Sequence, residues 1–140
     1  MSFKMINKIL LIPFFFLYAT WSCEDSEIDY SDWQSMTVTA SAYNSIKVQG
    51  EGNPKITAWG DTLRPGVRSI AVSRDLLRKG LSYQTPVKIE GLDGVFIVND
   101  KMHSRWRNKI DIYMGLEKEK ALEWGRRKVT IHFPAKTEEK

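Results

Sequence analysis

Short segments in which apolar and polar residues alternate recur along residues 36–135, and they constrain the fold more than any other feature. Successive side chains of a β-strand point to opposite faces, so each segment can bury one face. Turns rich in Gly, Pro and Asn separate the segments. Many short strands within about a hundred residues predict one small barrel. The expected strands are residues 36–43, 45–48, 69–72, 85–90, 94–99, 109–114 and 128–133.

Two helical segments interrupt the expected strands. Residues 117–127 begin with Glu and Lys and end with basic residues, which the helix dipole favours at a C-terminus. Ala121, Leu122 and Trp124 would form the apolar patch of this helix. A shorter helix is expected over residues 74–79, before a glycine. The expected fold class is therefore mainly β, with one or two short helices.

The first 22 residues have the composition of an export signal. Lys4 and Lys8 precede an apolar run of 11 residues, 9–19, which is too short to span a membrane but typical of a signal peptide. The run leads to Cys23, the only cysteine of the chain, at a position that resembles a bacterial lipoprotein cleavage site. We expect residues 1–22 to be removed and Cys23 to carry a lipid anchor. An ordinary signal peptide with an incidental cysteine is the alternative.

An acidic segment and a polar tail bound the expected barrel of residues 36–135. Residues 23–35 are acidic and poor in apolar side chains, which is typical of a flexible tether, and residues 136–140 form a frayed tail. Between them the chain is basic, since residues 33–135 contain 17 Lys and Arg against 10 Asp and Glu. At the outer membrane, where we expect the lipid anchor, the anionic partners of a basic domain are cell-wall polymers and lipid head groups. Nucleic acid is not an expected partner.

The sequence contains few groups suited to catalysis. Its two histidines, His103 and His132, are isolated, so no metal-ligand spacing occurs, and no glycine-rich phosphate loop is present. We therefore expect neither a metal nor a cofactor. His103 shares its segment with two aspartates and is a candidate base, whereas His132 is expected at the surface or at a sheet edge. The carboxylates are the remaining chemical resource.

Asp111 stands between Ile110 and Ile112 in an expected strand. The two isoleucines would enter the core, so Asp111 and Tyr113 would point to the other face. If that face is a cleft, burial would raise the pKa of Asp111 and suit it to protonate a leaving group. The alternative is a carboxylate that only accepts hydrogen bonds from a loop.

Arg105, Trp106 and Arg107 place an indole between two guanidinium groups. Such a cluster can serve as a stacking platform for a sugar. The alternative is one buried tryptophan anchor flanked by solvated charges. Of the other tryptophans, two are expected in the core and one at the edge of the domain (Trp59, Trp124 and Trp33, respectively).

Five blocks of the sequence together resemble the 3D domain, a family that is named for three aspartates. The family includes the catalytic barrel of the membrane-bound lytic transglycosylase A type. The resemblance covers roughly residues 37–133 and implies a six-stranded double-psi β-barrel. The blocks are TAWGDTLRPG at 57–66, IAVS at 70–73, VND at 98–100, IDIYM at 110–114 and WGRR at 124–127.

The resemblance implies that the protein cleaves peptidoglycan between muramic acid and glucosamine. Such a reaction closes an anhydro ring on the sugar and does not add water. Asp111 matches the family's general acid, and Asp100 matches an aspartate eleven residues earlier, whose like charge would raise the pKa of the acid. Ser73 stands where the family has its first aspartate, with Asp75 as a candidate substitute. Residues 101–106 replace a glycine-rich family segment and would line the cleft.

We therefore predict a lipid-anchored, monomeric envelope protein that acts on peptidoglycan glycan strands, with Asp111 and Asp100 as catalytic residues. One alternative is a wall-binding module that has the same barrel and no catalytic activity. Another is an envelope protein that binds other proteins and whose aspartates only brace loops. The residues expected to contact the substrate are Ser73, Asp75, His103, Arg105, Trp106 and Tyr113.

Overall fold

The computed structural model describes residues 29–44 and 56–136. The expected signal peptide, residues 23–28 of the acidic tether with Cys23, and the expected strand at 45–48 lie outside these residues, as do residues 137–140 of the tail. Within the described part, no helix is long and apolar enough to cross a membrane.

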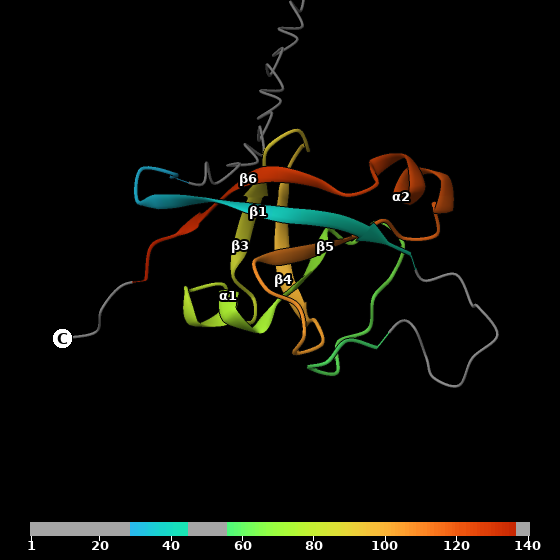
Figure 1. Ribbon diagram of the computed structural model, residues 1–140, viewed down its shortest axis with the longest axis horizontal. Helices are drawn as coiled ribbons and strands as arrows, with labels where there is room; N and C mark the ends of the chain where they lie inside the picture. The colour runs from blue at the N-terminus through green and yellow to red at the C-terminus, as the bar shows by residue number, and fades with distance from the viewer. Residues whose placement is uncertain (1–28, 45–55, 137–140) are drawn as a thin grey trace, which may run out of the picture.

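Six strands close into a barrel in the order β1-β5-β2-β4-β3-β6 (Figure 1). Each was expected from the alternation of the sequence, with ends that differ by a few residues. The largest difference is at β1, which begins within the range assigned to the tether because its first residues pair with the end of β6. The strands are β1 (Trp33–Tyr43), β2 (Ser69–Val72), β3 (Pro86–Ile89), β4 (Val95–Lys101), β5 (Lys109–Tyr113) and β6 (Arg127–Pro134).

Two connections cross a neighbouring strand. β5 lies between β1 and β2 and is parallel to β1, and β2 lies between β4 and β5 and is parallel to β4. The connection from β1 to β2 therefore crosses β5, and the connection from β4 to β5 crosses β2. The remaining pairs are antiparallel. The expected six-stranded double-psi barrel is confirmed.

Two short helices, α1 (Arg74–Arg78) and α2 (Lys118–Trp124), lie outside the barrel. In α2, Ala121 is buried, but Leu122 is 69% exposed, so its assignment to the apolar patch is wrong. Consecutive helical residues differ by about 100° around the axis. A helix that turns Ala121 inward therefore turns Leu122 towards solvent.

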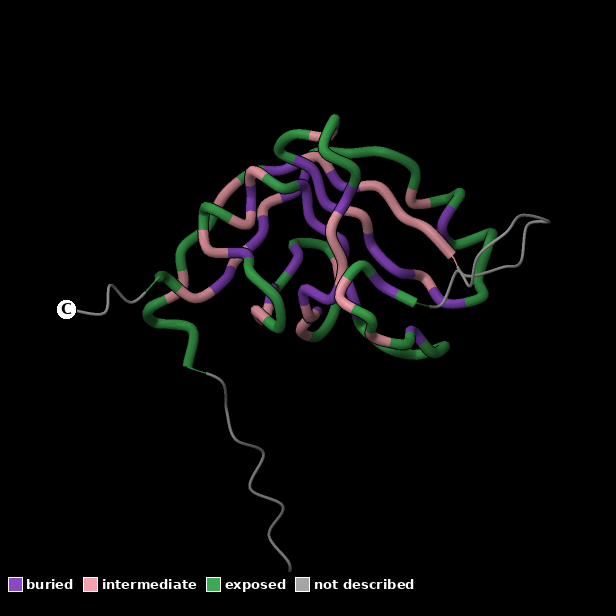
Figure 2. The backbone as a smooth tube through the Cα atoms, turned by 90° about the horizontal axis from the view of Figure 1, so that it is seen from below, coloured by how far each residue is buried: buried purple, intermediate pink, exposed green. Residues whose placement is uncertain are grey.

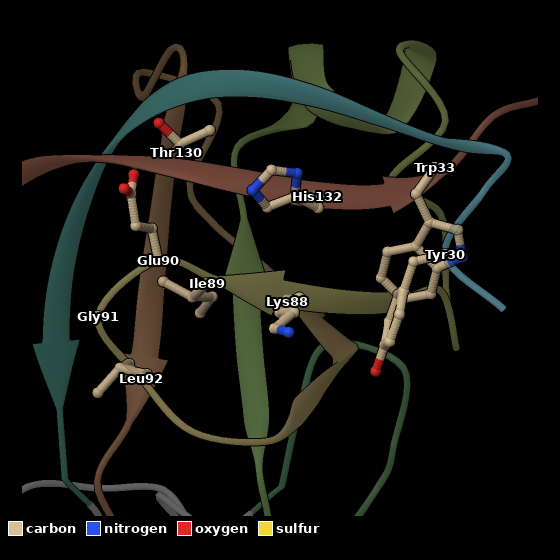
Figure 3. A pocket seen from close by; sticks show the side chains of 9 residues that line it. All are labelled: Tyr30, Trp33, Lys88, Ile89, Glu90, Gly91, Leu92, Thr130 and His132. Carbon is tan, nitrogen blue, oxygen red and sulfur yellow. The ribbon is translucent and has the colours of Figure 1, made fainter. Parts of the chain in front are cut away.

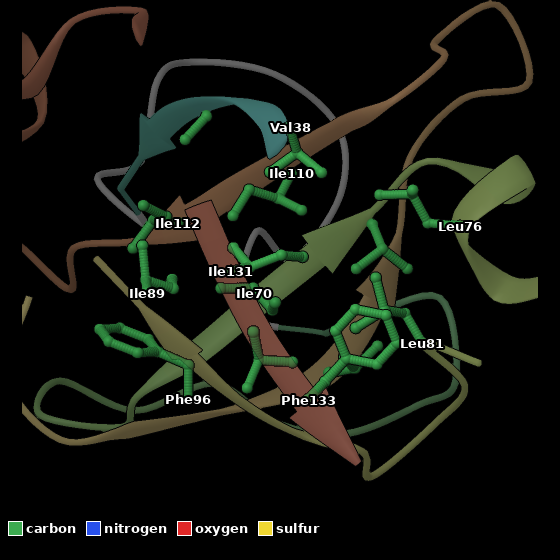
Figure 4. Packing of buried hydrophobic residues seen from close by; sticks show 14 of the residues in the cluster. Val38, Ile70, Leu76, Leu81, Ile89, Phe96, Ile110, Ile112, Ile131 and Phe133 are labelled. Atoms are coloured by element: carbon green, nitrogen blue, oxygen red, sulfur yellow. The ribbon is translucent and has the colours of Figure 1, made fainter. Parts of the chain in front are cut away.

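The barrel interior holds a continuous hydrophobic core (Figure 4). Buried and more exposed residues alternate along the strands, as the tube in Figure 2 shows. Ile110 and Ile112 are fully buried as predicted, and each contributes about 1.5–3 kcal/mol by its burial, which fixes the orientation of β5. Trp59 and Trp124 are only partly buried and pack against the outside of the core, which corrects their assignment to its interior.

Candidate functional site

One residue of β2, Ala71, lies between the two predicted catalytic aspartates. It pairs with Asp111 on β5 and with Asp100 on β4. Side chains of directly paired residues share a face of the sheet, so both carboxyl groups lie on the same side of β2. Their Cα atoms are two strand spacings apart, about 10 Å. The small side chain of Ala71 leaves the space between them open.

An irregularity in β4 produces this alignment. Ile70 pairs with Val98, but Ala71 pairs with Asp100, so Asn99 has no partner in the register between β2 and β4. An extra residue of this kind is a β-bulge, which changes the side-chain face of the residues that follow it. The Oδ1 atom of Asn99 instead accepts a hydrogen bond from Nε2 of Gln84, at 2.8 Å. Without the bulge, Asn99 would lie beside Ala71 in place of Asp100.

The two aspartates line a cleft of about 280 Å³. Its walls come from β1, β2, β5 and the segment that begins at the end of β4. Asp111 therefore faces a cleft, on the side of β5 opposite to Ile110 and Ile112. The lining residues are Tyr43, Ala71, Asp100, Lys101, Met102, His103, Trp106 and Asp111.

Asp111 is half-buried and accepts a hydrogen bond from the Ser41 hydroxyl, with 3.0 Å between Oγ and Oδ1. Burial raises the pKa of Asp111 above its ordinary value. The Ser41 hydrogen bond and the positive charges of Lys109 and Arg126 oppose this change in the pKa, and the charge of Asp100 adds to it. The pKa of Asp111 is therefore raised, as expected. Desolvation is the main cause, and the charge of Asp100 is a minor one.

Asp100 has a different environment. Its Oδ1 atom accepts hydrogen bonds from the backbone N–H groups of Ala58, at 2.7 Å, and Lys101, at 2.8 Å. The first of these bonds ties the loop before β2 to the rim of the cleft. Asp100 thus braces a loop and lines the cleft at the same time.

Tyr43 is a cleft residue that the sequence did not single out. Its buried hydroxyl has no hydrogen-bond partner among the described residues. Burial and the nearby charges of Asp100 and Asp111 raise the pKa of this phenol, so it stays protonated at neutral pH. The only signal in the sequence was its position at the end of an expected strand.

Tyr113 does not lie in the cleft. It is 3% exposed, and its ring centroid is 5.4 Å from that of Tyr43. It lines a separate groove with Pro65 and Met114. The alternation of β5 placed Tyr113 and Asp111 on one face, but the ring of Tyr43 covers part of that face.

Ser73 and Asp75 lie at the start of α1, away from the residues that line the cleft. Ser73 is fully buried, and its Oγ atom accepts a hydrogen bond from the Lys109 N–H at 3.0 Å. The Oδ2 atom of Asp75 accepts one from the Asn108 N–H, also at 3.0 Å. Both side chains hold the start of β5 against α1.

The segment between β4 and β5 forms one wall of the cleft. His103 and Trp106 line it, and the Nδ1 atom of His103 accepts a hydrogen bond from the Arg105 N–H at 3.3 Å. The Trp106 ring is not an open platform, because the Lys109 ammonium lies 3.9 Å from its centroid. The guanidinium groups of Arg105 and Arg126 lie 5.0 Å and 6.0 Å from the same centroid.

A larger groove of about 570 Å³ lies on the outside of β3 and β6. Figure 3 shows Tyr30 and Trp33 at one end of this groove and Leu92 at the other. Its lining includes His132, which was expected at the surface, and none of the predicted site residues. The described residues contain no group of three or more His, Cys, Asp or Glu side chains that would suit a metal ion.

No protein-family model matches the sequence. No curated protein matches it either. Among solved structures, Streptomyces papain inhibitor is similar, with a TM-score of 0.52 and 19% identity over 76% of this chain and 99% of the inhibitor. This likeness supports the barrel fold alone.

Clavibacter michiganensis expansin also aligns, with a TM-score of 0.45 and 17% identity over 76% of this chain. A mutant of the same expansin in complex with cellohexaose aligns with a TM-score of 0.44 and 14% identity. This chain spans about half of each expansin chain, 52%.

Proposed function

We propose that this protein binds glycan strands of peptidoglycan in the cleft around Asp111. The alignment of Asp111 and Asp100 on either side of Ala71 is the observation that carries the proposal. Carboxylates accept hydrogen bonds from sugar hydroxyls and amides, and aromatic walls pack on the apolar faces of sugar rings. Tyr43 lines the cleft and supplies such a wall.

Two features favour binding over cleavage as the primary function. Asp100 uses one oxygen to hold the backbone of Ala58 and Lys101. Ser73, at the place of the first aspartate in the 3D pattern, is buried beneath the start of β5. The constellation of three carboxylates that names that family is therefore incomplete in this cleft.

The location in the cell envelope is part of the proposal. It rests on the apolar run of residues 9–19 and on Cys23, which resemble a lipoprotein signal. Lipid attached to Cys23 would hold the barrel at the outer membrane, facing the wall. The excess of basic residues in the domain suits it to the anionic wall polymers.

Glycosidic-bond cleavage is the second candidate function, and the raised pKa of Asp111 favours it. A raised pKa makes a carboxyl more able to hold a proton and to donate it to the leaving oxygen. In a lytic reaction the attacking hydroxyl belongs to the sugar itself, so one carboxyl can act first as acid and then as base. Asp111 would perform both steps.

A substitution at the floor of the cleft tests the binding site. Ala71→Leu should place a larger side chain between the two aspartates and weaken binding to purified sacculi about tenfold or more, a change of about 1.4 kcal/mol. Thr130→Leu is the matched control, because Thr130 lines the groove over β3 and β6. Co-sedimentation of the purified protein with sacculi measures both.

The same incubation separates the two candidate functions. Retention on sacculi without released fragments supports a binding module, and anhydro-muropeptides in the supernatant support lytic cleavage. If Ala71→Leu binds as the wild type does and Thr130→Leu loses binding, the glycan site is the other groove. If the wild-type protein does not sediment with sacculi, the proposal is wrong.

A further inference from the structure

Three cationic side chains gather around one ring beside the cleft. Lys109 is the first residue of β5 and is only 7% exposed. Its ammonium lies 3.9 Å from the centroid of the Trp106 ring. Arg105 precedes Trp106 in the chain, whereas Arg126 comes from the segment between α2 and β6. The barrel thus brings Arg126 to a segment that already contains Arg105 and Lys109.

This cation cluster (Lys109, Arg105 and Arg126) has little negative charge to balance it. Among residues 29–44 and 56–136, the one side-chain salt bridge joins Lys120 and Glu117. The carboxylate of Asp111 interacts electrostatically with two members of the cluster, Lys109 and Arg126. One carboxyl does not neutralise three cations. Contact with an indole face offsets an unbalanced cation only in part.

The cluster adjoins the proposed glycan site through Trp106. The indole of Trp106 lines the cleft, and all three cations lie near the same ring. A ligand that lies across Asp111 and Ala71 would therefore bring its substituents to the cluster. Two guanidinium groups and an ammonium suit a carboxylate, which an arginine can bind with two parallel hydrogen bonds.

We propose that Lys109, Arg105 and Arg126 form a carboxylate-binding subsite at the edge of the Asp111 cleft. The inference rests on the proposed function and makes it more specific, since it selects acid-bearing wall glycan over neutral glycan. The carboxylate has two sources in peptidoglycan. One is the lactyl group of muramic acid after the stem peptide has been removed, and the other is the stem peptide itself.

The experiment compares three probes with the purified protein. Glycan strands stripped of stem peptides carry lactyl carboxylates, intact sacculi carry stem carboxylates, and chitin has a similar N-acetylated backbone without a carboxylate. The wild-type protein should bind at least one acidic probe about tenfold or more tightly than chitin. Raising the ionic strength should reduce this preference, because salt screens charge interactions.

The double variant Arg105→Gln/Arg126→Gln should lose the preference and bind all three probes as weakly as the wild type binds chitin. Arg68→Gln is the matched control, because Arg68 is exposed and lines the separate groove with Tyr113. The control should keep the full preference. Both residues of the double variant are exposed, so its far-UV spectrum and melting temperature should match those of the wild type.

The result also identifies the source of the carboxylate. Preference for stripped strands indicates the lactyl group, and preference for intact sacculi indicates the stem peptide. If the double variant keeps the wild-type preference, or if the wild type binds chitin equally well, the subsite inference is wrong although glycan binding stands. If no probe binds to the wild type, the proposed function itself fails.

Discussion

Opposing influences act on the protonation of Asp111. Burial disfavours the charged carboxylate, while the Ser41 hydroxyl and the cations Lys109 and Arg126 favour it, and the net effect raises its pKa. An acid with a raised pKa in the folded state stabilises the fold most when it is protonated. Its contribution is complete below the ordinary pKa of 3.8 and is lost as the pH rises through the folded pKa.

Asp111→Asn should therefore change stability in a pH-dependent way. The variant should have a higher free energy of unfolding than the wild type near neutral pH, and the difference should shrink as the pH falls to about 3. Urea denaturation at several pH values measures this, with the exposed Asp93→Asn as control. If wild-type protein releases fragments from sacculi, Asp111→Asn should reduce that release about 10²-fold or more. A variant that is less stable at neutral pH would show that the charged carboxylate braces the fold.

At the scale of elements, the junction of β2, α1 and β5 determines where the cleft residues lie. The N–H of Ser73 donates to the Lys109 carbonyl at 2.8 Å, and the Ser73 Oγ accepts from the Lys109 N–H. These two bonds fix the first residue of β5, and Asp111 follows two residues later. The alignment of Asp111 with Ala71 thus depends on a buried serine that does not line the cleft.

Ser73→Ala should lower the free energy of unfolding by about 1–3 kcal/mol, because it leaves the buried Lys109 N–H without a partner. Binding of the folded variant to sacculi should not change, because the backbone N–H of residue 73 still donates to the Lys109 carbonyl and keeps Asp111 aligned with Ala71. Ser82→Ala removes an exposed hydroxyl that pairs with Thr85 and supplies the control. Chemical denaturation and co-sedimentation measure the two effects. A loss of binding without a loss of stability would mean that Ser73 contacts the ligand, as the sequence predicted.

At the scale of the molecule, the barrel presents a cleft on one side and a larger groove over β3 and β6 on another. β1 and β6 run side by side, and β1 begins at Trp33, which also lines the larger groove. Tyr30, near the start of the described residues, lines the same groove and not the Asp111 cleft.

Cys23→Ala should release the protein from the membrane fraction, because lipid on Cys23 is the proposed anchor and no described helix can span a membrane. Fractionation of cells in high salt, with detection of the protein in pellet and supernatant, measures the release. A Cys23→Ala variant that still sediments with membranes in high salt would refute the lipoprotein assignment.

Much of the fold was predictable because local patterns encode which way side chains point. Alternation along residues 109–113 correctly placed Ile110 and Ile112 in the core and Asp111 on the opposite face. The two helices were expected close to their observed positions. The prediction that Leu122 belongs to a packed apolar patch was wrong, because the apolar composition of a short helix does not reveal which side packs against the barrel.

The sequence by itself determined the strand content and which residues of β5 enter the core, because these follow from a period of two residues along the chain. Tertiary structure decided which side chains meet. A bulge at Asn99 turned Asp100 towards Ala71, and a shift of one residue would have sent it to the other face. Closure of the barrel brought Arg126 to Trp106. Such contacts join residues far apart in the chain, so no local pattern specifies them.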